Sequence, residues 1–78
     1  MKAILGKNYI HYKNGHEYTV VAIGKMERNP NEVYVIYRAE YASPDYDGNM
    51  TWIRPLQEFE EDVTYNGAVV PRFKLIDA

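Results

Sequence analysis

Turn-forming residues interrupt this chain so often that only short regular segments fit between them. Glycine tolerates positive φ and proline fixes its own φ, so both residue types end or redirect regular structure. No long apolar repeat with helical spacing lies between the turns, so the pattern predicts a protein built from strands. The turn signals are Asn14-Gly15, Asn29-Pro30-Asn31, Ser43-Pro44-Asp45, Asp47-Gly48-Asn49 and Asn66-Gly67.

The segments between these turns are rich in Val, Ile, Tyr and Thr, which favour strands. The predicted strands are 9–12, 17–25, 32–41, 49–54, 63–65 and 68–70. Alternation puts Tyr18, Val20 and Ala22 on one face of the second strand and Thr19, Val21 and Ile23 on the other. Pro55 ends the fourth strand because it has no N–H, and 56–61 has room for one helical turn. Asn66-Gly67 predicts a two-residue type I′ hairpin.

These strands predict one mainly β domain over residues 1–78. The expected architecture is a small SH3-like barrel or a strongly bent antiparallel sheet of five to six short strands. A chain of 78 residues buries a modest core and has no cysteine to form disulfides. We therefore expect a homo-oligomer, because a subunit interface can supply the missing stability.

Composition also restricts the cellular locations and the binding partners that we expect for this protein. No segment is long and apolar enough to span a membrane, and the start of the chain does not resemble a signal peptide. With the absence of cysteine, this predicts a cytoplasmic protein of a bacterial cell or of a phage-infected bacterial cell. The net charge of −2 argues against a nucleic-acid partner, since such proteins usually carry a basic stripe.

No recognisable catalytic or metal-binding motif is present. His16 follows a turn, and His11 lies within a strand, where a backbone contact can satisfy it. Two histidines five residues apart do not match a metal site, and Ser43 has no nucleophile motif around it. We expect a protein that is not an enzyme and that uses no cofactor and no metal.

Arginines beside aromatic residues are the remaining chemical signal, because guanidinium pairs with anions and stacks on rings. They occur in Tyr37-Arg38, Trp52-Ile53-Arg54 and Pro71-Arg72-Phe73. If Ile53 points to the core, Trp52 and Arg54 share the opposite face and face outward or line a cleft. In the structural alternative, Trp52 is a core residue and Arg54 pairs with Glu58.

The sequence also resembles a small bacterial and phage family, domain of unknown function 1653. The matching segments are Gly6-x-x-Tyr9-x-His11-Tyr12-Lys13, Tyr18-x-Val20, Val35-Ile36-Tyr37-Arg38-Ala39-x-Tyr41, Trp52-Ile53-Arg54-Pro55-Leu56-x-x-Phe59 and Gly67-x-x-x-Pro71-Arg72-Phe73. The family often has a histidine shortly after the alanine of the second strand, where this chain has Ile23-Gly24-Lys25-Met26. The resemblance implies a compact, mostly β fold and no assigned activity.

From these signals we expect a non-catalytic receptor for a small anionic ligand with a ring, such as a nucleotide or a nucleotide-derived signal. A phage receptor of this kind would sequester a host signal. The site would lie at or near a subunit interface, because one small domain rarely encloses a ligand-sized pocket. The candidate binding residues are His11, Tyr12, Tyr37, Arg38, Tyr41, Trp52, Arg54 and Arg72.

Three other functions stay open from the sequence. An SH3-like peptide-interaction module would use Tyr9, Tyr12, Tyr41 and Trp52 as its groove. The acidic run at 58–62 would then select basic partners. A single-stranded nucleic-acid binder would stack bases on the aromatic residues, although the net charge argues against it. An enzyme is the fourth alternative.

Overall fold

The computed structural model describes residues 2–42 and 49–76. Within them the chain forms β1 (Asn8–His11), β2 (Glu17–Met26), β3 (Asn29–Ala39), β4 (Thr51–Pro55), α1 (Leu56–Phe59), β5 (Asp62–Tyr65), β6 (Ala68–Pro71) and β7 (Phe73–Leu75). The turn signals expected at 43–48 lie outside the described residues. In the described ranges, no helix is long and apolar enough to cross a membrane.

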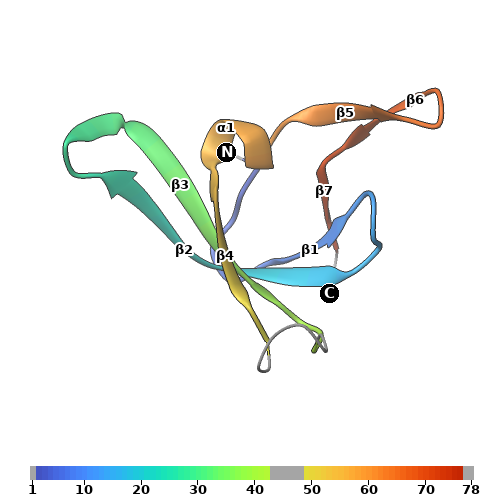
Figure 1. Ribbon diagram of the computed structural model, residues 1–78, viewed down its shortest axis with the longest axis horizontal. Helices are drawn as coiled ribbons and strands as arrows, with labels where there is room; N and C mark the ends of the chain where they lie inside the picture. The colour runs from blue at the N-terminus through green and yellow to red at the C-terminus, as the bar shows by residue number, and fades with distance from the viewer. Residues whose placement is uncertain (1, 43–48, 77–78) are drawn as a thin grey trace.

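The strands form two antiparallel sheets. The larger has the order β4-β3-β2-β1-β7, and the hairpin β5-β6 forms the smaller. Figure 1 shows that the large sheet bends, with the outer ends of β2 and β3 on one side of α1 and β5-β6 on the other. The expected mainly β class is confirmed, and the bent sheet is the architecture found. A closed barrel is not formed by the described residues.

The six strands expected from the turn pattern are present, with ends shifted by a few residues. The hairpin at Asn66-Gly67 has positive φ at both residues, 51° and 79°, as a type I′ turn requires. Asn29-Pro30-Asn31 is not a turn but begins β3. The β2-β3 ladder tolerates Pro30 because the register shifts there. Lys25 pairs with Val33 and Met26 with Asn29, so Pro30 has no partner in the ladder and needs no N–H.

A β-bulge in β2 overturns part of the expected alternation. Val20 pairs with Tyr37, whereas Ala22 pairs with Ile36, so one extra residue is inserted between them. The insertion reverses the faces beyond it. Ile23 therefore packs against the core, and Ala22 shares the face of Ile36. Bulges also bend the strand that carries them, which agrees with the bent sheet.

The core lies on one face of the large sheet, here called the inner face. It is mostly aromatic, and edge-to-face and stacked ring pairs connect its members. Phe59 of α1 stacks on Phe73 of β7 with ring centroids 4.2 Å apart. The buried core residues are Ala3, Tyr9, Tyr18, Val20, Val35, Tyr37, Ala39, Phe59 and Phe73.

The short helix is held against this face by hydrogen bonds as well as by packing. Arg72 donates from Nε to the Glu58 carbonyl (3.0 Å) and pairs with Glu61 (3.1 Å). The backbone N–H of Ala3 donates to the Glu60 carboxylate (3.0 Å). In Figure 1 the start of the chain accordingly lies beside α1. These contacts fix the helix above the sheet and so shape the inner face around it.

Candidate functional site

A cleft of about 170 Å3 opens on the inner face, beside the aromatic core. It combines aromatic walls with one guanidinium, one imidazole and one amide. Its lining comes from β1, the turn after it, β2, β3, β4 and β7. The lining residues are His11, Asn14, Tyr18, Tyr37, Trp52, Arg54 and Phe73.

Strand register explains why these residues meet. Residues directly opposite in an antiparallel pair share a face. Trp52 pairs with Tyr37, and Arg54 pairs with Val35, so both face the core side. Ile53 lies on the outer face and is 66% exposed, so the conditional placement of Ile53 in the core does not hold. Trp52 and Arg54 nevertheless line a cleft, because the cleft lies on this same inner face.

Arg54 has two partners at the cleft. Its Nε donates to the Tyr37 hydroxyl (3.4 Å), and its NH1 pairs with Glu58 (3.3 Å). The sequence had suggested the Glu58 pair as the structural alternative, and it is present. Glu58 is half-exposed, and such ion pairs contribute little net free energy. A guanidinium carries five N–H groups, so Arg54 can also serve an incoming anion. Trp52 is 37% exposed and is not a core residue.

His11 stands at one wall of the cleft. Its Nδ1 accepts a hydrogen bond from the Lys13 backbone N–H (3.1 Å), which places the proton of the neutral ring on Nε2. Burial lowers the pKa of His11 below its ordinary value of 6.5, and the positive charges of Arg54, Arg72 and Lys13 lower it further. At neutral pH, His11 is therefore an uncharged N–H donor.

The lowered pKa of His11 gives a direct prediction about stability. As the pH falls below 6.5, the unfolded chain takes up a proton on this imidazole that the folded protein does not bind. The free energy of unfolding should therefore decrease until the lower, folded-state pKa is reached. Urea unfolding between about pH 7.5 and about pH 5.5 measures this slope. H11N, which keeps an acceptor for Lys13, should flatten it. An unchanged slope in H11N contradicts the prediction.

A hydroxyl network continues the polar part of the cleft. The Tyr18 hydroxyl accepts from Asn14 Nδ2 (3.1 Å) and shares a hydrogen bond with the Tyr41 hydroxyl (3.0 Å). Tyr41 also stacks on His16, with ring centroids 4.1 Å apart. Tyr41 therefore supports the cleft through Tyr18 and does not line it.

The other candidate residues lie elsewhere. Arg38 is on the outer face, where it pairs with Glu40 (2.9 Å), so Arg38 and Arg54 do not converge. Arg72 holds α1 through its hydrogen bond to the Glu58 carbonyl. It does not line the cleft and acts there only through the effect of its positive charge on His11. Tyr12 stacks on His11, with centroids 4.9 Å apart, but lines a neighbouring groove.

Three lining residues were not among those expected from the sequence: Asn14, Tyr18 and Phe73. The sequence predicts only a turn position for Asn14 and only a strand face for Tyr18. Phe73 belongs to the Pro71-Arg72-Phe73 segment, in which the predicted binding residue is Arg72. Its position depends on the pairing of His11 with Phe73, which joins β1 to β7. Local sequence pattern carries no signal for that long-range pairing.

The side chains of the cleft offer hydrogen-bond donors and aromatic rings. Arg54, Asn14 and His11 bring N–H groups, and Trp52 and Tyr37 bring aromatic faces. Within residues 2–42 and 49–76, no three His, Cys, Asp or Glu side chains cluster as metal ligands would.

The described residues form a small β protein, a bent antiparallel sheet with an aromatic, arginine-bearing cleft on its inner face. The chain belongs to the family described as "Protein of unknown function (DUF1653)", whose profile matches residues 7–75. Among solved structures it is similar to the crystal structure of a DUF1653 protein from Bordetella bronchiseptica. The two are 28% identical, with a TM-score of 0.77, over 97% of this chain and 91% of that chain. A comparison with curated proteins gives no match.

Proposed function

We propose that this protein is a non-catalytic receptor for a small anionic ligand that carries a planar ring, such as a nucleotide or a nucleotide-derived signal. The supporting observation is that Trp52 and Arg54 face one cleft, with the Tyr37 hydroxyl 3.4 Å from Arg54 Nε. Tryptophan offers a stacking face for a ring, and arginine pairs with phosphate or carboxylate. If a phage encodes the receptor, binding would sequester a host signal in the bacterial cytoplasm.

The size of the cleft bears on how the ligand is held. Its volume, about 170 Å3, is below the roughly 300 Å3 at which ligand sites usually begin. The cleft therefore takes one part of the ligand and leaves the rest to other contacts. Because β4 is an edge strand of the large sheet, a second copy could approach Trp52 from that side. We propose a homo-oligomer in which the site lies near this interface.

A peptide-interaction module is the second candidate function, and the edge position of β4 favours it. An extended peptide can add a strand to an exposed sheet edge through backbone hydrogen bonds. Trp52, on that strand, would then contact a side chain of the peptide. A groove for basic peptides would retain its ligand after Arg54 is replaced, whereas the proposed anion receptor would not.

Binding of adenosine and guanosine monophosphates to variants tests the receptor. Trp52 is the only tryptophan, so ligand binding should change the intrinsic fluorescence of the wild type, and calorimetry extends the measurement to W52A. W52A should weaken binding by about tenfold or more, since stacking a base contributes about 1–3 kcal/mol. R54Q should weaken it by a similar factor, because it removes the guanidinium that pairs with the phosphate. R38Q is the matched arginine control, because Arg38 lies on the outer face.

Two outcomes contradict the site assignment. One is unchanged affinity in folded W52A and R54Q, and the other is an equal loss in R38Q. Native mass spectrometry of the protein purified from cells, followed by analysis of released small molecules, tests the ligand class and the oligomer together. A nucleotide-like mass on a discrete oligomer supports the proposal, and basic peptide binding that survives R54Q supports the module.

A further inference from the structure

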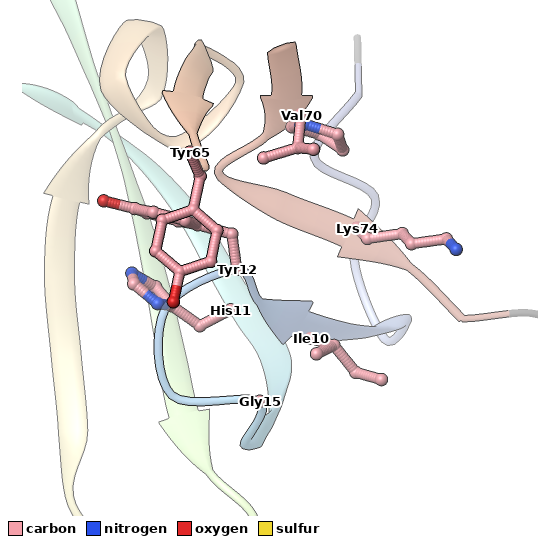
Figure 2. Close-up of a pocket in the computed structure, with 8 residues that line it drawn as sticks. Ile10, His11, Tyr12, Gly15, Tyr65, Val70 and Lys74 are labelled. Carbon is pink, nitrogen blue, oxygen red and sulfur yellow. The ribbon is translucent and has the colours of Figure 1, made fainter. Parts of the chain in front are cut away.

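A second and larger concavity, here called the groove, lies next to the cleft. It has a volume of about 370 Å3 and runs between β1, the turn that follows it and the β5-β6 hairpin. Figure 2 shows Tyr12, Tyr65 and His11 at one side and Lys74 extending away from the tyrosines at the other. Its lining residues are Ile10, His11, Tyr12, Gly15, Tyr65, Val70, Pro71 and Lys74.

The groove and the cleft share one wall. His11 lines both, and no other residue does. Its ring stacks on Tyr12, and Tyr12 meets Tyr65 edge to face with centroids 5.3 Å apart. A ligand that extends past His11 from the cleft therefore reaches a second aromatic surface.

Positive charge gathers where the two concavities meet. Arg54 lies in the cleft, and Lys13 directly follows Tyr12. The charges of Arg54, Arg72 and Lys13 all act on the His11 imidazole. The glutamates that pair with Arg54 and Arg72 are each about half-exposed, so water weakens those ion pairs. An anionic group beside His11 would be stabilised from several directions.

We propose that the ligand is a dinucleotide-type anion, with two rings joined through phosphate. Its phosphate lies beside His11, one ring lies in the cleft against Trp52, and the other lies in the groove against Tyr65. This inference rests on the proposed receptor function and names the ligand class of the same site. The groove supplies the space that the cleft lacks, since ligand sites usually exceed roughly 300 Å3.

The test compares two probes, adenosine monophosphate and diadenosine diphosphate, by calorimetry on the full chain. Wild type should bind the two-ring probe about tenfold or more tightly than the one-ring probe, because a second base stacks in the groove. Tyr65 is 41% exposed, so Y65A removes the groove ring with little loss of packing. Y65A should abolish the preference and leave adenosine monophosphate binding unchanged, whereas W52A should weaken both probes.

V69A is the matched control, because Val69 lies on the same hairpin and is 73% exposed. It should keep the preference, which separates loss of the groove ring from general damage to β5-β6. Equal affinity of wild type for both probes, or a preference that survives Y65A, overturns the two-ring proposal and leaves the receptor standing. Failure of wild type to bind either probe overturns the receptor itself.

Discussion

Replacing Phe73 with alanine is expected to lower the free energy of unfolding by about 3–5 kcal/mol. Phe73 is 7% exposed and contacts four other aromatic rings of the inner face. A chain of this length is expected to have a total stability of only about 4–12 kcal/mol. F73A should therefore remove at least about a quarter of the total stability, and at the lower end of that range it would leave a large fraction of the molecules unfolded at room temperature.

Chemical unfolding followed by circular dichroism measures the Phe73 effect. F73L is the graded variant: it keeps an apolar side chain at the position and should cost less than F73A, because the cavity is smaller. V69A, at an exposed site, should change stability little. A loss below about 1 kcal/mol in F73A would contradict the central role given to β7 in the core.

The second large effect is expected at Tyr9. Its ring is 2% exposed, and its hydroxyl donates to the Lys2 carbonyl (2.6 Å) and accepts from the Ile4 N–H (2.8 Å). Y9F keeps the packing but leaves both backbone groups without this partner. Removing one partner of a buried hydrogen bond costs about 1–3 kcal/mol. The start of the chain should then be held less tightly against β1, so hydrogen exchange at the Ile4 amide should become faster.

Y34F is the matched control for Y9F. The Tyr34 hydroxyl donates to Glu32 (2.9 Å) in an exposed pair, so its removal should cost far less. Equal losses in the two variants would mean that the Tyr9 hydroxyl contributes no more than a surface hydrogen bond.

Much of the fold could be predicted from the sequence because its signals are local. The turn at Asn66-Gly67 and the shared face of Tyr18 and Val20 each depend on neighbours along the chain. The turn between β2 and β3 could not be located, because Glu27 and Arg28 are not typical turn residues, whereas Pro30 is. The bulge after Val20 was equally hidden, because an inserted residue leaves no mark in composition.

Only part of the candidate site could be predicted from the sequence. Trp52 and Arg54 share a face through simple alternation, so their proximity follows from spacing. The separation of Arg38 from that face depends on the β3–β4 register, which places its neighbour Tyr37 opposite Trp52. The approach of His11 to Trp52 required the order of the strands, which no local pattern specifies.

The pairing of β1 with β7 also has a kinetic consequence. Tyr9 is opposite Leu75, so the β1-β7 pair joins segments from near the two ends of the described chain. By contrast, β2, β3 and β4 pair with strands that are adjacent in sequence. Closing long loops costs more chain entropy, and folds rich in distant contacts form slowly. During synthesis, the β2-β3-β4 meander can assemble early, but the aromatic core stays open until β7 has left the ribosome.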